Sequence, residues 1–113
     1  MSVMFGGCSS VNSLNLSNFN TNGVKNMCGM FNGCCKLNSL NLSNFNTNNA
    51  IYIAGMFYGC SSLTYLDINN FNCDNIKTTD LMDGMFKGCK SLKLDNVSYK
   101  DFKIRNQLII DLK

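Results

Sequence analysis

Cysteine is the residue type with the greatest chemical reach in this chain of 113 residues, and four of its seven cysteines stand at one place in a repeated motif. The motif is Met-Phe-x-Gly-Cys, and it ends at Cys8, Cys34, Cys60 and Cys89. A row of thiolates could bind a metal ion or be converted to disulfides. Which chemistry is open depends on how the repeats place these cysteines in space.

Stacking of the repeats argues against both chemistries. Ligands that lie in a line, one repeat apart, do not converge on a tetrahedral centre, and the sequence has no C-x-x-C pair. Neighbouring strands would bring the Cα atoms within disulfide range, but equivalent side chains point in parallel and not at each other. We therefore expect no metal and no disulfide in this row, which should consist of small buried side chains.

Acid–base catalysis has few residues to draw on. The sequence contains no His and no Glu, which removes the commonest general base and several of the usual metal ligands. We expect no enzyme activity, no catalytic residue and no cofactor.

The charge of the chain is unevenly distributed. Residues 1–60 contain only Lys25 and Lys36 and no acidic residue, so that most of the basic and all of the acidic residues follow. Interspersed charges of both signs are typical of a solvated surface and not of a nucleic-acid-binding stripe. No apolar run is long enough to span a bilayer, and the opening residues lack the pattern of a signal peptide. We expect no nucleic-acid partner and no membrane insertion.

The segments that position these residues form an internal repeat. Met-Phe-x-Gly-Cys begins at residues 4, 30 and 56, with a period of 26, and again at 85, so that three extra residues fall near 77–83. Between the motifs runs L-x-x-L-x-L-x-x-F, and its L-x-L part has the period of two of a strand with one inward face. We expect strands near 13–16, 39–42 and 65–68, and an irregular one near 92–97.

A period of this length is typical of a solenoid. The predicted fold is a leucine-rich-repeat-like, right-handed coil with a short parallel β-sheet on one face and irregular or short helical returns on the other. A glycine at the same place in every repeat indicates a positive φ or close stacking. Like residues should lie on like residues, in two phenylalanine ladders (Phe5, Phe31, Phe57, Phe86 and Phe19, Phe45, Phe71) and two asparagine ladders (Asn18, Asn44, Asn70 and Asn20, Asn46, Asn72).

We divide the chain into a repeat domain, 1–92, with coils that start at 4, 30, 56 and 85, and a C-terminal cap, 93–113. A solenoid end exposes apolar surface and unpaired backbone, so a charged and atypical cap is expected there. Several apolar residues of the cap are even-numbered: Phe102, Ile104, Leu108, Ile110 and Leu112. This alternation favours a pair of strands, and a helix is the alternative.

The segments "MFNGCCKLNSLNLSNFNTNN" and "GCSSLTYLDINNFNCDN" resemble the BspA-like leucine-rich-repeat surface proteins. The resemblance covers residues 4–92 and combines the L-x-x-L-x-L core with the MFxGC and SNFNT segments. It implies a parallel-sheet solenoid of surface-exposed proteins linked to adhesion, without catalytic residues. By this resemblance the location would be the cell surface or outside the cell, whereas abundant unpaired thiols fit a reducing compartment better.

The strand face is the candidate binding surface. Its outward positions are Ser39, Asn41 and Ser43 in the second repeat, and they change to Tyr65, Asp67 and Asn69 in the third. Tyr is a common interface anchor, and a carboxylate beside it can orient a hydroxyl group or a cation. The predicted function is a non-catalytic binding module that contacts a protein or a glycan through this face. The alternative is a structural spacer or an assembly unit that associates end to end.

Overall fold

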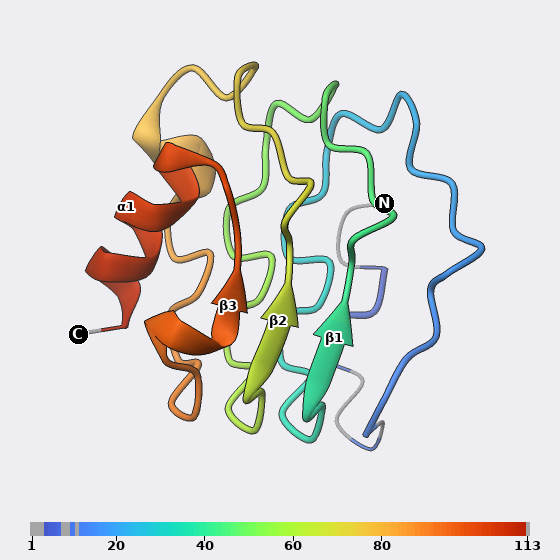
Figure 1. Cartoon of the computed structure of the whole chain (residues 1–113), viewed down its shortest axis with the longest axis vertical. Coiled ribbons are helices and arrows are strands. Elements are labelled where there is room, and N and C mark those ends of the chain that lie inside the picture. Colours follow the sequence, from blue (N-terminus) through green and yellow to red (C-terminus); the bar gives the residue numbers. More distant parts are fainter. Residues whose placement is uncertain (1–3, 8–9, 11, 113) are drawn as a thin grey trace.

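The computed structural model of the chain describes residues 4–7, 10 and 12–112. These residues form the strands β1 (Ser39–Asn41), β2 (Tyr65–Asp67) and β3 (Val97–Ser98), the 3-10 helices η1 (Thr79–Met82) and η2 (Leu94–Asn96), and the helix α1 (Phe102–Asp111). Successive turns of the chain lie side by side, with the strands on one face, the return segments behind them and α1 at one end (Figure 1).

The strands make a parallel sheet in the order β1-β2-β3. Leu40 lies opposite Leu66, and both are buried because alternate residues of each short strand point into the core. The predicted parallel pairing of 39–42 with 65–68 is therefore confirmed. The irregular strand expected near 92–97 corresponds to β3. It begins only at the last residue of that range, because the 3-10 helix η2 occupies the residues before it.

The prediction of a strand at 13–16 is wrong, because these residues adopt no regular strand. The backbone N–H of Asn38 donates to the carbonyl of Asn12 (3.1 Å), but strand pairing does not continue from there. Leu16 is buried and Leu14 is half-buried, so the inward pattern persists without the hydrogen-bond ladder. An apolar period of two reports which side chains face inward, and it does not by itself establish strand pairing.

A second ladder of hydrogen bonds joins the return segments. In each repeat, alternate backbone N–H groups donate to carbonyls in the following repeat, at about the same level. Around the start of the second repeat these bonds are Met27 to Tyr52, Gly29 to Ala54, Phe31 to Met56 and Gly33 to Tyr58, all between 2.8 and 3.0 Å. The equivalent positions one repeat later donate in the same way: Ile53 to Leu81, Gly55 to Asp83, Phe57 to Met85 and Gly59 to Lys87.

The recurring glycines allow the repeats to approach closely. Gly59 and Gly88 both have a positive φ, 76° and 83°. A Cβ atom on Gly88 would lie 3.2 Å from the backbone N and Cα of Gly59, closer than ordinary side chains pack. The prediction of a positive φ or close stacking is confirmed, and at Gly88 both reasons hold.

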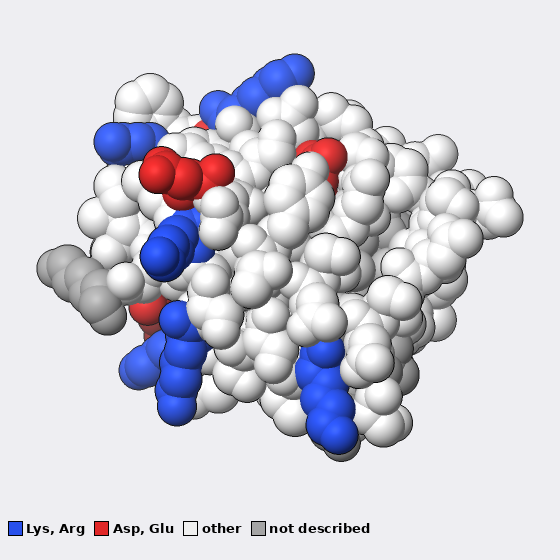
Figure 2. Space-filling view, turned by 60° about the horizontal axis from the view of Figure 1, so that its bottom comes forward, with Lys and Arg blue, Asp and Glu red and all other residues white. Residues whose placement is uncertain are grey.

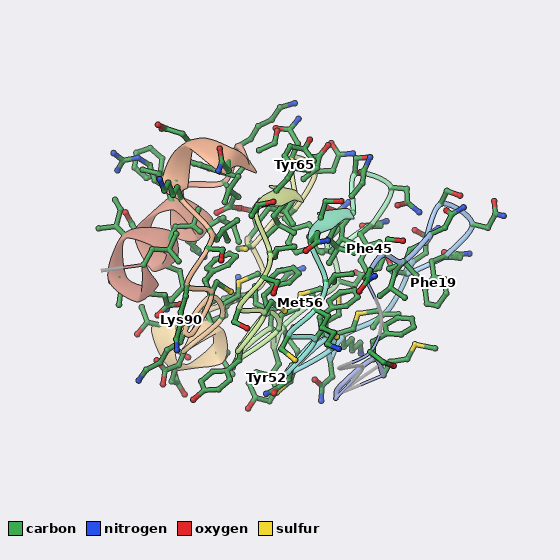
Figure 3. The ribbon with its side chains drawn as sticks, turned by 90° about the horizontal axis from the view of Figure 1, so that it is seen from below. Phe19, Phe45, Tyr52, Met56, Tyr65 and Lys90 are labelled. Carbon is green, nitrogen blue, oxygen red and sulfur yellow. The ribbon has the colours of Figure 1, made fainter. Side chains whose placement is uncertain are left out.

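Stacked phenylalanines fill the core. The rings of Phe5, Phe31, Phe57 and Phe86 follow one another at 5.4, 5.7 and 5.6 Å, with interplanar angles of 9° or less. Phe19 and Phe45 stack at 6.5 Å and lie side by side in Figure 3. The ladder of Phe5, Phe31, Phe57 and Phe86 is therefore confirmed, and the second ladder is confirmed for Phe19 and Phe45, while its third member, Phe71, is buried.

The asparagine columns bond differently from the prediction. The side-chain amide of Asn44 donates to the carbonyls of Leu16 (2.9 Å) and Ser17 (3.2 Å), and the amide of Asn70 donates to the carbonyl of Ser43. In the column of Asn18, Asn44 and Asn70, the expected ladder of amide on amide is thus replaced by amide on backbone. In the other column, the amide of Asn46 donates to the side-chain oxygen of Asn22 (2.9 Å) and not to Asn20. The carbonyl of Leu16 also accepts from the N–H of Phe19, whereas no described backbone N–H donates to the carbonyls of Ser17 and Ser43, which the amide of the next repeat satisfies.

The cap is helical, so the predicted strand pair is wrong. Ile104 and Leu108 are buried beneath α1, one helical turn apart, and the half-buried Leu112 continues the same line. Asp101 is the N-cap of α1 and accepts a hydrogen bond from the N–H of Lys103 (2.7 Å). Residues 104, 108 and 112 are separated by four, which fits one face of a helix, and they are also all even-numbered, which fits one face of a strand. The pattern is therefore ambiguous from the sequence.

The charged residues gather around this capped end. Figure 2 shows most Lys, Arg and Asp side chains over the part of the molecule that holds the fourth repeat and α1, while the opposite end is largely uncharged. Across the ranges described above, no helix combines the length and apolar character needed to cross a bilayer.

Candidate binding face

The strand face brings four of the six predicted residues together. Ser39 lies beside Tyr65 and Asn41 beside Asp67 in the register of β1 and β2. Ser39, Asn41 and Tyr65 are exposed and Asp67 is half-buried. The buried leucines between them, Leu40 and Leu66, hold the strands so that these side chains share one surface.

The other two predicted residues lie beyond the strands, where an Asx turn ends each of them. The carboxamide oxygen of Asn41 accepts from the N–H of Ser43 (2.9 Å), and a carboxylate oxygen of Asp67 accepts from the N–H of Asn69 (3.1 Å). An Asn or Asp at this position therefore has a structural role, because its side chain turns the chain out of the sheet. Asp67 retains a second carboxylate oxygen, and this is the atom that an Asn in its place would not offer as an acceptor.

Tyr65 is the largest side chain on this face. It is 46% exposed, and Figure 3 shows it at the outer surface of the sheet, on the side opposite to Tyr52. The equivalent position in the second repeat is Ser39, which the same backbone accommodates. The tyrosine ring is therefore not needed to fill the fold at this position.

Shallow hollows lie at both edges of the face. One, of about 180 Å³, lies between residues 14–17 and the end of β1, and its polar lining includes Asn15, Asn41 and Ser43. The other, of about 330 Å³, lies beyond β2 and is lined by Asn69 together with Lys100 and Asp101. Amides, hydroxyls and charged groups line these hollows, and they suit hydroxyl-rich or peptide-like ligands better than apolar ones.

The cysteine row lies in the core, away from this face. Cys34, Cys60 and Cys89 are buried, as predicted, and Cys8 lies outside the described residues. Each thiol donates to a phenylalanine carbonyl one repeat earlier: Cys34 to Phe5 (3.1 Å), Cys60 to Phe31 (3.2 Å) and Cys89 to Phe57 (3.1 Å). Cysteine thus serves as a hydrogen-bond donor as well as a small apolar side chain, a role that the sequence analysis missed.

Burial also makes these thiols weak acids. It raises the pKa of Cys89 to about 12, and it raises the pKa of Cys60 further. Cys73 is also buried, and the same cause raises its pKa to about 12. Cys60, Cys73 and Cys89 are free thiols that remain protonated at neutral pH, so they offer no nucleophile and no thiolate ligand. Among the described residues, no group of three His, Cys, Asp or Glu side chains converges on a point where a metal could bind.

The return side carries exposed groups that the sequence analysis did not single out. Ile51 is 48% exposed and Tyr58 is 44% exposed. Tyr52 lies on the same side, and its hydrogen bond with Cys28 raises the pKa of the tyrosine. For Tyr58, the sequence does contain a signal. The variable position between Phe and Gly of the Met-Phe-x-Gly-Cys motif is Asn32 in the second repeat and Tyr58 in the third, and packing does not require this change.

Comparison with known proteins places the chain in one family. No curated protein and no solved structure matches it. One family model matches residues 1–108, and its description reads "Mycoplasma protein of unknown function, DUF285". Because this match takes in nearly the whole sequence, the chain belongs to the DUF285 family.

Proposed function

We propose that the chain is a non-catalytic binding module, built as a short leucine-rich-repeat-like solenoid, which contacts a protein or a glycan through its strand face. The proposal includes membership of the BspA-like surface proteins, with a location on or outside the cell. The repeat sequence, the parallel sheet and the family match are the grounds for this assignment.

One observation carries the binding role. Between the second and third repeats, the inward strand residue stays Leu while the outward neighbours change from Ser39 and Asn41 to Tyr65 and Asp67. Both pairs sit at the same register on the same backbone, so the change does not serve packing. An exposed Tyr beside a carboxylate combines a rigid apolar body with directional acceptors, which is a combination found at protein and glycan contacts.

The fold supplies a variant that tests this face without damage to the core. Tyr65→Ser with Asp67→Asn rewrites the third repeat with the residues of the second, and Asn41 already makes the same turn that Asp67 makes. We expect the free energy of unfolding to change by about 0.5 kcal/mol or less, as for other surface substitutions. Binding to a glycan array and to a panel of immobilised surface and matrix proteins should fall at least about tenfold, which corresponds to about 1.4 kcal/mol.

Tyr58→Asn is the matched control. It also removes a tyrosine of similar exposure and also installs the residue of the second repeat, but on the return side. Retained binding in the control and lost binding in the strand-face variant would support the proposal. Equal binding in both variants, or no binding by the unaltered chain to any probe, would count against it.

A further inference from the structure

The ladder of the return segments has a direction. From Met27 to Gly33, and in the equivalent segments before and after, each inter-repeat bond runs from a backbone N–H in the earlier repeat to a carbonyl in the later one. Over this segment each repeat therefore has a donor edge, which faces the C-terminal end of the stack, and an acceptor edge, which faces the N-terminal end. Outside the segment the direction also reverses, since Ile51 donates back to Lys25 and Thr64 to Asn38.

The helix α1 lies against the donor edge of the last repeat (Figure 1) and supplies an acceptor for one of its N–H groups. The N–H of Phe86 donates to a carboxylate oxygen of Asp111 (3.0 Å), whereas the equivalent N–H of Phe57 donates to the backbone carbonyl of Met85 (2.9 Å). At the same end, the N–H of Cys73 donates to Asp101 (2.8 Å). The cap thus replaces the carbonyl that a following repeat would offer to Phe86 with the carboxylate of Asp111, and Asp101 binds a second N–H at the same end.

The acceptor edge of the first repeat is open within the described part of the chain. The carbonyls of Met30 and Asn32 accept from Phe5 (2.8 Å) and Gly7 (2.7 Å), but no described backbone N–H donates to the equivalent carbonyls of Met4 and Gly6. Met4 is 53% exposed, whereas the equivalent Met30 is fully buried. Among the described residues, no segment lies against this side of the first repeat as the preceding repeat does for each later one.

We propose that the N-terminal end face binds a coil of the same repeat, through the donor edge of that coil, whichever chain carries it. The fit continues the existing ladder, since a phenylalanine and a glycine N–H of the incoming coil would meet the carbonyls of Met4 and Gly6. A second copy of this chain is not the occupant. Its own donor edge is covered by α1, and two acceptor edges facing each other would oppose carbonyl with carbonyl.

The size of the face suits such a contact. The stacking direction lies across the view of Figure 1, so the end face spans the other two extents of the molecule, 32 and 20 Å. A rectangle of that size covers roughly 640 Å², close to the about 800 Å² per partner of a standard protein interface. The N-terminal half has no acidic residue and few basic ones, so charge does not oppose the approach of a similar coil.

The test adds one coil to the full chain at either end. In one protein a copy of residues 30–55 is inserted directly before Met4, and in the matched control the same copy follows Lys113. Hydrogen exchange followed by mass spectrometry then reports protection in the added copy and in residues 56–112. We expect the inserted copy to exchange at least about tenfold more slowly than the appended copy, because only the inserted one meets an acceptor edge. The melting temperature should rise only for the insertion.

Each other outcome overturns the proposal. An inserted copy that exchanges as fast as the appended one shows that the end face does not accept a coil. Equal protection at both ends shows that α1 does not close the donor edge. Loss of protection in residues 56–112 only in the inserted protein shows that the edges do not match. A ladder of oligomers of the unaltered chain in sedimentation shows that copies stack despite the cap. This proposal does not depend on ligand binding by the strand face.

Discussion

Replacement of Thr47 by Val should destabilise the protein through two lost hydrogen bonds and no lost shape. Thr47 is 2% exposed, and its hydroxyl bridges to the next repeat. The hydroxyl donates to the carbonyl of Asn72 (3.1 Å) and accepts from the N–H of the same residue (2.7 Å). Thr21 makes the same two bonds to Asn46, so the bridge is a repeated device. Val has the shape of Thr but neither bond.

The magnitude follows from the groups that lose their partner. An unsatisfied backbone group costs about 1–3 kcal/mol when it is buried, and Asn72 is half-buried, so we take the lower part of that range for both its N–H and its C=O. The added methyl returns up to about 0.8 kcal/mol. The net loss in the free energy of unfolding should be about 1–3 kcal/mol, which lowers the melting temperature by roughly 4 °C for each kcal/mol.

Urea unfolding measures this loss in the free energy of unfolding, and Thr64→Val is the control. Thr64 is exposed, and its hydroxyl donates to the carbonyl of Asn38 (3.1 Å), which already accepts from the N–H of Thr64. The control should lose no more than about 0.5 kcal/mol. A Thr47→Val protein as stable as the control, with an unchanged slope against urea, would show that water satisfies Asn72 and that the threonine bridge does not hold the repeats together.

Three further predictions concern the cap, the glycine column and the thiols. Asp111→Ala should lower the free energy of unfolding by about 1–3 kcal/mol in urea titrations, because the N–H of Phe86 loses its acceptor, and Asp111→Asn should cost less. Gly88→Ala should cost more than Gly7→Ala: both have a positive φ, worth about 1–2 kcal/mol, but only at Gly88 would the Cβ meet backbone. Burial raises the pKa of Cys89 to about 12 in the folded chain, so stability should be complete below about pH 8.5 and fall as the pH rises toward 12, since only the unfolded chain then loses the proton. Thermal melts at pH 7 and 10 should show this loss, and Cys89→Ala should reduce it; equal melting temperatures at both pH values would contradict it.

The sequence predicted the parts of the fold that depend on one repeated pattern. Leu40 and Leu66 lie in register because the L-x-L spacing and the period of the motif both place them at the same level. The phenylalanine stack could be predicted for the same reason, since identical side chains at one level have only each other as neighbours.

The wrong predictions concern the two ends of the repeat and the polar side chains that have more than one possible hydrogen-bond partner. At 13–16 the inward leucines are present, but no strand forms at this outermost position. In the cap, parity and helical spacing select overlapping residues, and Asp101 as the N-cap was the signal that separated them. For Asn44, the sequence indicated a polar column, but a backbone carbonyl competed with the neighbouring amide, and only the geometry of the turn shows which acceptor is nearer.

The candidate binding face was predictable as a surface because fold and face depend on different atoms of the same strand. In the third repeat, Leu66 and the Asx turn of Asp67 preserve what Leu40 and Asn41 do in the second. The tyrosine ring and the second carboxylate oxygen are additions to that shared frame, and neither is required to close the turn or fill the core. A repeat protein can therefore change its outward residues one coil at a time while its stability stays in the core. This separation is why the exchange of Tyr65 and Asp67 for the residues of the second repeat should reveal a loss of binding undisturbed by unfolding.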